Sequence, residues 1–66
     1  MSDAEDETRA ALRMLEPRIA DFEALVRDAA ATCAPGDPML QSLRHSLDML
    51  RRERQRLRER LKQADS

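Results

Sequence analysis

Apolar residues recur at alternating intervals of three and four along two long stretches of this chain. That spacing predicts two amphipathic helices, each with one apolar stripe that faces another helix. Only Arg54 interrupts the pattern. We call the two stripes together the seam. Its apolar members are Leu12, Leu15, Ile19, Phe22, Val26, Ala29 and Cys33 in the first stretch, and Leu40, Leu43, Leu47, Leu50, Leu57, Leu61 and Ala64 in the second.

A turn separates the two stretches, at Ala34–Pro35–Gly36–Asp37–Pro38. Proline cannot continue a helix, and we expect Gly36 to adopt the left-handed conformation that ends one. Asp37 can cap the next helix, whose first position suits Pro38. A turn this short makes long helices antiparallel neighbours. The predicted fold is therefore all-α, an antiparallel two-helix hairpin over residues 8–64, with a first helix at about 6–33, a turn at 34–37 and a second helix at about 38–63.

Pro17 contradicts the first helix locally. A proline inside a helix removes a hydrogen bond and costs about 3 kcal/mol. Either the main helix begins at Pro17 and residues 8–16 form a separate turn, or one kinked helix runs through. We favour the kinked helix because the seam keeps its phase across Pro17, which lies opposite the seam, so that a kink would bend the helix around its partner.

The charged residues beside the seam test the antiparallel arrangement independently. When the chain is folded about the turn, opposite charges face each other on both sides of the seam. Each exposed pair contributes only about 0–1 kcal/mol, so such pairs select the orientation more than they stabilise it. The expected pairs are Glu23 with Arg51, Glu16 with Arg58, and Arg18 with Glu53.

One seam is a small core for a chain of 66 residues. Domains of this size are marginally stable alone, and the single cysteine excludes an internal disulfide. We therefore expect a second layer of helices, from another copy of the chain or from a different helical protein, that completes a four-helix bundle. Arg54 either extends its charged group to water from the seam or selects the partner through a carboxylate across the interface.

Charge is distributed unevenly along the chain. Residues 1–7 carry four acidic residues and no basic one, and we expect them to form a disordered tail. The C-terminal part of the second helix is basic, which suits a helix C-terminus and also offers an alternative function in binding nucleic acid. No aromatic residue is interleaved there to stack on bases, and the pI is about 5.8, so we prefer the first interpretation. The possible nucleic-acid contacts are Arg51, Arg52, Arg56, Arg58, Arg60 and Lys62.

Residues suited to catalysis or metal binding are few. Cys33 has no neighbour placed to activate it and is expected to be a small buried apolar residue. His45 falls on the outer face of the second helix. The sequence lacks a phosphate-binding loop and metal-ligand spacing, and a two-helix chain offers little concave volume. We predict no enzymatic activity, no cofactor, no bound metal and no small-molecule substrate.

The expected compartment is the cytoplasm, because no signal peptide and no apolar run long enough for a membrane span are visible. The bias toward Ala and Arg suggests a GC-rich bacterial or phage genome. Small residues around the turn, at 29–34, predict close helix packing or else a shallow groove for a partner. Four large apolar residues lie off the seam and form either scattered exposed positions or a binding patch: Met14, Leu25, Met39 and Met49.

In architecture, the two seams and the turn at Pro35–Pro38 resemble those of the bacterial hairpin co-chaperones of type III secretion needle subunits, and also those of the dimeric RNA-binding hairpins of plasmid copy control. The first resemblance implies a partner protein, the second a homodimer. We predict a non-enzymatic protein–protein interaction module, an adaptor, co-chaperone or assembly subunit. Its expected interface is Leu12, Leu15, Ile19, Phe22, Val26, Leu40, Leu43, Leu47, Leu50, Arg54, Leu57 and Leu61.

Overall fold

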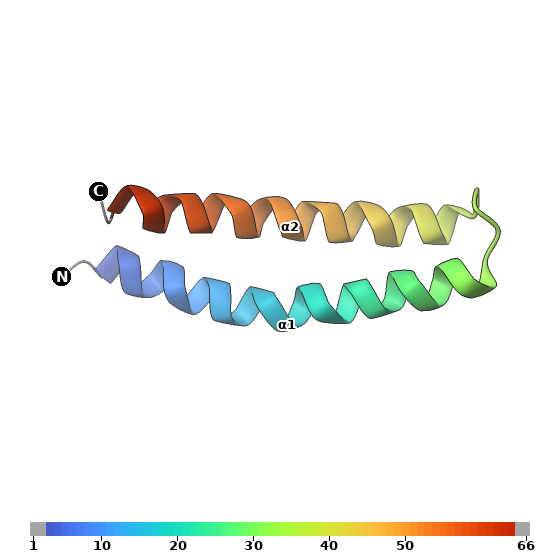
Figure 1. Cartoon of the computed structure of the whole chain (residues 1–66), viewed down its shortest axis with the longest axis horizontal. Coiled ribbons are helices and arrows are strands. Elements are labelled where there is room, and N and C mark those ends of the chain that lie inside the picture. The colour runs from blue at the N-terminus through green and yellow to red at the C-terminus, as the bar shows by residue number, and fades with distance from the viewer. Residues whose placement is uncertain (1–2, 65–66) are drawn as a thin grey trace.

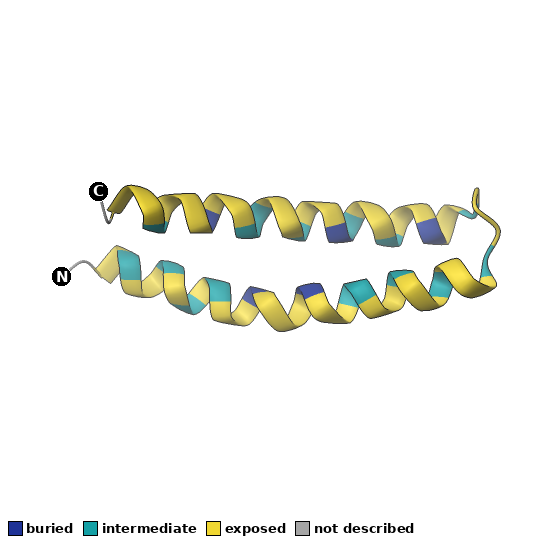
Figure 2. Ribbon diagram, viewed as in Figure 1, coloured by how far each residue is buried: buried dark blue, intermediate teal, exposed yellow. Residues whose placement is uncertain are grey.

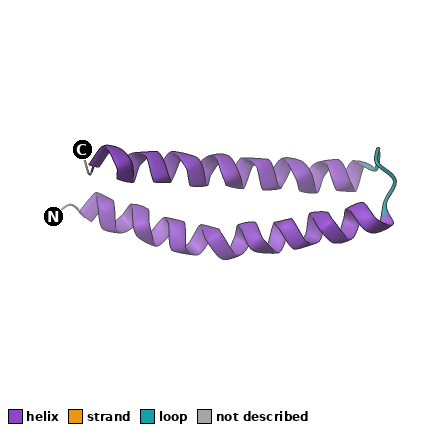
Figure 3. Ribbon diagram, viewed as in Figure 1, coloured by secondary structure: helices purple, strands orange, loops and turns teal. Residues whose placement is uncertain are grey.

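The computed structural model describes residues 3–64, which form two long helices joined by a short turn (Figures 1 and 3). Helix α1 spans Asp3–Thr32 and helix α2 spans Pro38–Ala64. The helices run antiparallel and side by side, so the molecule is a rod of 49 × 16 × 13 Å. The predicted helical hairpin is confirmed. Its completion to a four-helix bundle remains a prediction.

The seam is the contact between the two helices. Ile19 is the most buried residue of α1, with 1% of its surface exposed, and Leu40 is equally buried beside the turn. Figure 2 shows the buried positions on the facing sides of the two ribbons and the exposed positions outside. The main core cluster consists of Leu15, Ile19, Leu47 and Leu57, with Leu12, Phe22, Val26 and Leu50 packed against it.

Helix α1 begins earlier than the sequence suggested. Residues 1–7 were expected to be a disordered tail, but the helix already includes Asp3, while residues 1 and 2 lie outside the described part of the chain. Acidic side chains in a first turn interact favourably with the helix dipole. Arg9 adds ion pairs one turn later, at 3.8 Å from both Glu5 and Asp6. These local interactions explain why an acidic segment is helical here.

Pro17 lies inside α1 without ending it, as the kinked-helix interpretation predicted. Its ring removes the backbone donor that would bond to the carbonyl of Arg13 and pushes that carbonyl away. Pro17 is exposed, and Figure 1 shows α1 bowed with its concave side toward α2. The proline therefore lies on the convex side, where an opened hydrogen bond lets the helix curve around its partner.

The turn is defined mainly by the residues that begin α2. The carboxylate of Asp37 accepts a hydrogen bond from the backbone N–H of Met39 at 2.8 Å, and Pro38 is the first residue of α2, as expected. The backbone N–H of Asp37 donates to the carbonyl of Ala34 at 3.0 Å. The expected left-handed conformation of Gly36 was wrong: no described glycine has a positive φ. The cap on α2, and not a glycine cap on α1, defines this turn.

Candidate interaction surface

One side of the hairpin carries ion pairs between the helices. Arg51 donates to the carboxylate of Glu23 at 2.9 Å, and Arg58 donates to that of Glu16 at 3.3 Å. Both pairs were predicted from the sequence. All four side chains are roughly half exposed, so water screens the pairs and each contributes little to stability. Their main effect is to fix which residues of α1 lie opposite which residues of α2.

Arg54 lies at its predicted seam position, and its side chain extends toward these ion pairs. Its guanidinium lies 3.6 Å from the carboxylate of Glu16, and its side chain is 25% exposed. Glu16 is therefore shared between Arg54 and Arg58. The carboxylate that answers Arg54 belongs to the same chain, whereas the partner-selecting interpretation placed it across an interface.

The third predicted pair, Arg18 with Glu53, was wrong. Glu53 pairs instead with Arg56 on its own helix, at 2.9 Å. A partner three residues away is reached at small entropic cost, so it competes well with one on the other helix. Among the described residues, Arg18 has no ion pair.

The opposite side of the hairpin carries the exposed apolar residues. Their exposed fractions are 74% for Met14, 49% for Leu25, 61% for Met39 and 45% for Met49. Each of the four directly precedes a seam residue in the sequence. The positions that directly precede seam residues therefore form a second stripe on each helix, with the same alternating spacing of three and four. We call this side the methionine flank; its large and charged residues are Met14, Arg18, Asp21, Leu25 and Asp28 of α1, and Met39, Met49, Glu53, Arg56 and Arg60 of α2.

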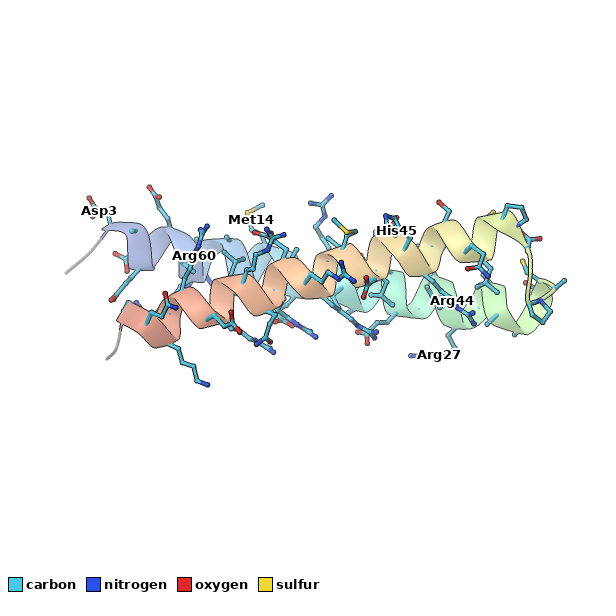
Figure 4. The ribbon with its side chains drawn as sticks, turned by 90° about the horizontal axis from the view of Figure 1, so that it is seen from above. Asp3, Met14, Arg27, Arg44, His45 and Arg60 are labelled. Carbon is cyan, nitrogen blue, oxygen red and sulfur yellow. The ribbon has the colours of Figure 1, made fainter. Side chains whose placement is uncertain are left out.

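The two sides are distinct because the observed ion pairs define them. Glu16, Glu23, Arg51 and Arg58 each lie one residue after a seam position, and they meet on one side. Stripes one residue before the seam must then meet on the other side, since each helix turns by about 100° per residue. Figure 4 shows Met14 at one edge of the hairpin and Arg27 at the other. We call the second side the ion-pair flank; its residues are Arg13, Glu16, Ala20, Glu23, Arg27 and Ala30 of α1, and Gln41, Arg44, Asp48, Arg51, Gln55, Arg58 and Lys62 of α2.

The methionine flank continues into the seam. Phe22, Leu43 and Leu50 are only half-buried by the hairpin. Phe22 lies four residues after Arg18 and three before Leu25, so it is their neighbour on the helix surface. These partly exposed apolar side chains therefore lie beside the apolar and charged residues of the flank.

The seam residues that were predicted as a partner interface pack within the hairpin. The buried ones are Leu15, Ile19, Leu40, Leu47 and Leu57. The remainder keep a partly exposed edge, and their contact with a partner stays a prediction. They are Leu12, Phe22, Val26, Leu43, Leu50, Arg54 and Leu61.

The methionine flank was underestimated from sequence. Its four large apolar residues were recognised as lying off the seam, but their common side was not. The available signal was a second repeat with the period of the seam, displaced by one position. Charged residues fill most of that repeat, so hydrophobicity alone does not reveal it.

The basic segment at 51–62 is largely neutralised by local carboxylates. Arg52 pairs with Asp48 at 3.1 Å, in addition to the pairs of Arg51, Arg54, Arg56 and Arg58 described above. Within the described residues, Arg60 and Lys62 are the only cations of this segment that have no ion pair. The cations also point to several sides of α2 and do not form one continuous basic face.

The remaining candidates offer little chemistry. Cys33 is half-buried beside Thr32, and His45 is exposed on α2. Residues 3–64 contain no group of three or more His, Cys, Asp or Glu side chains that could hold a metal ion. An open groove beside Arg44 lies on the ion-pair flank and is lined by Glu23, Val26, Arg27, Leu47, Asp48 and Arg51. Neither described helix has an apolar stretch of the length that crossing a membrane requires.

Comparisons with known proteins were also made at the level of sequence family, curated sequence and solved structure. No family model matches the chain. The searches of curated proteins and of solved structures likewise found no significant match.

Proposed function

We propose that this chain is a non-enzymatic protein–protein interaction module, a small adaptor, co-chaperone or assembly subunit that binds helices through its methionine flank. The observation that carries the proposal is that, among residues 3–64, all four exposed large apolar side chains lie on that flank. An isolated exposed apolar residue is ordinary, whereas several that share one side of a helical hairpin mark a candidate interaction surface. Methionine is also suited to such surfaces because its flexible side chain adapts to its neighbour.

The half-buried seam residues strengthen the proposal. Phe22, Leu43 and Leu50 would lose their remaining exposed area if another helix covered the flank. Burying apolar surface contributes about 25 cal/mol per Å². A partner helix docked there would add the second layer that a two-helix hairpin lacks.

The proposal is tested by placing a photo-crosslinking residue at Leu25 or Met49, and at Ala20 or Ala30 on the ion-pair flank as controls. All four positions lie outside the core cluster. We expect discrete protein adducts from positions 25 and 49 and none from positions 20 and 30. Glu at both flank positions, Leu25→Glu with Met49→Glu, should abolish the adducts, whereas Ala20→Glu with Ala30→Glu should not. Adducts confined to the control positions would contradict the proposal.

Binding of nucleic acid by the basic segment is the competing function. The ion pairs made by the arginines of that segment speak against it, because each neutralises a cation that would otherwise meet a phosphate. A salt titration separates the two functions. Affinity for nucleic acid falls steeply with salt, whereas apolar docking does not. Tight, salt-sensitive binding of the purified chain to DNA or RNA would replace the proposal.

A further inference from the structure

We infer that the methionine flank binds a second copy of this chain, antiparallel and related by a two-fold axis between Arg18 and Asp21. The inference rests on the proposed function and names the partner. It starts from the order in which charged and apolar residues follow one another along the flank.

The ion pairs show which residues of α1 and α2 lie at the same height along the rod; we call each such height a level. Glu23 with Arg51 and Glu16 with Arg58 both join residues whose numbers add to 74. The same register applies to the other side of the same two helices. On the methionine flank it places four successive levels, from the open end toward the turn: Met14 with Arg60, Arg18 with Arg56, Asp21 with Glu53, and Leu25 with Met49.

The charges on these levels become complementary when a second copy is turned end for end and placed against the flank of the first. A two-fold axis in the interface plane, perpendicular to the rod, brings the Arg18 level of one copy onto the Asp21 level of the other. Arg18 of each copy then faces Asp21 of the other, and this pair forms twice because of the symmetry. The neighbouring Arg56 and Glu53 already pair with each other on their own helix, so the charge pairs between the copies come from Arg18 and Asp21. The next levels outward bring Met14 of each copy onto Leu25 of the other. On α2 the same levels bring Arg60 of each copy onto Met49 of the other. The flank thus offers charge pairs at its centre, with an apolar contact on the α1 side at each end of them.

The parallel arrangement is disfavoured by the same charges. With the two rods parallel, each level would meet its own copy, so Arg18 and Arg56 would face two further arginines. Asp21 and Glu53 would likewise face two further carboxylates. Like charges set against each other at an interface are unfavourable, so the charges of Arg18 and Asp21 favour the antiparallel dimer over the parallel one.

Two further observations agree with this dimer. Neither Arg18 nor Asp21 has an ion pair among the described residues, and both are exposed, so both are free for a second copy. The exposed surface is also large. A compact monomer of this mass exposes about 4,300 Å², whereas this chain exposes 5131 Å². The excess follows from the rod shape of 49 × 16 × 13 Å, whose long side is large enough for the roughly 800 Å² that each partner buries in a standard interface.

The test exchanges the two central charges. Arg18→Asp places an anion opposite Asp21 of the second copy, and Asp21→Arg places a cation opposite Arg18. Each variant alone should therefore dissociate, with a dimer dissociation constant raised at least about 10-fold. A mixture of the two should form a heterodimer, because each altered residue then meets its opposite charge. The double variant should dimerise with itself for the same reason.

Sedimentation at micromolar concentration measures the parent and the variants, and native mass spectrometry identifies the heterodimer by its intermediate mass. Circular dichroism verifies that each variant is folded. Arg27→Asp is the matched control, since Arg27 is an exposed arginine without an ion pair on the ion-pair flank; it should leave the dimer unchanged.

Three results would overturn the inference: a monomeric parent, a dimer that Arg18→Asp does not weaken, or single variants that fail to pair when mixed. A monomeric parent whose flank still cross-links to another protein would refute the second copy as partner and leave the proposed function intact. A parent that neither dimerises nor cross-links through the flank would refute both the inference and the proposed function.

Discussion

The guanidinium of Arg54 lies 3.6 Å from the carboxylate of Glu16, on the neighbouring helix. The pair joins a seam position of α2 to the ion-pair flank of α1. An arginine in an apolar seam is thus accommodated by reaching sideways to a carboxylate that already binds Arg58.

Replacing this arginine by leucine should stabilise the hairpin. Arg54→Leu loses one partly exposed ion pair, worth about 0–1 kcal/mol, while Glu16 keeps Arg58. The new leucine buries apolar surface in the seam, worth up to about 1.5–3 kcal/mol. We expect the free energy of unfolding to rise by about 1 kcal/mol, measured by urea denaturation. Arg58→Leu, which loses a pair outside the seam, should give no comparable gain; a less stable Arg54→Leu would show that the ion pair outweighs apolar packing.

The proline inside α1 should cost stability. Pro17→Ala restores the backbone donor toward the carbonyl of Arg13 and removes the clash of the ring. We expect a gain of about 1–3 kcal/mol in thermal or urea unfolding, with higher helicity by circular dichroism. Ala24→Pro places a proline one heptad further along the same exposed face and should destabilise by about 3 kcal/mol. A less stable Pro17→Ala would mean that the bow of α1 is needed for the seam to close.

The cap of α2 should contribute to the free energy of unfolding. Asp37→Ala removes the acceptor for the backbone N–H of Met39 and should cost about 1 kcal/mol. Asp37→Asn keeps an acceptor oxygen and should lose much less. Equal losses for the two variants in urea denaturation would show that charge, and not the hydrogen bond, is what the capping position supplies.

Gly36 should tolerate a side chain. Its φ is not positive, and a Cβ built there meets nothing within 4 Å. Gly36→Ala therefore adds no strain and restricts the unfolded chain, which should stabilise by about 0.4–1 kcal/mol. A loss of more than about 1 kcal/mol in the same assay would restore the left-handed turn that the sequence suggested.

Most of the fold could be predicted because periodicity determines it. The spacing of the seam from Leu12 to Leu61 fixed which sides of the helices meet, and Asp37 with Pro38 fixed where α2 begins. The pairs of Glu23 with Arg51 and Glu16 with Arg58 followed from the same geometry. In each case one arrangement was far better than any other.

The errors occurred where several arrangements have similar free energies. Glu53 can reach Arg56 on its own helix as easily as Arg18 on the other, and Glu16 can serve two arginines. The start of α1 depended on short-range pairs such as Arg9 with Glu5, which the expectation of a disordered tail did not weigh. The methionine flank was missed as a unit because charged residues such as Arg18, Asp21 and Glu53 fill most of its repeat, so that hydrophobicity alone does not group its apolar members.

The antiparallel arrangement also determines the order in which contacts can form during folding. The pair of Arg51 with Glu23 closes a segment of 28 residues, and that of Arg58 with Glu16 closes one of 42. Closing a longer loop costs more conformational entropy, so contacts near the turn form first and those at the open end last. Substitutions around Asp37 and Leu40 should then slow folding, whereas substitutions around Leu12 and Leu61 should accelerate unfolding. The hairpin would lose its structure on heating from the open end toward the turn.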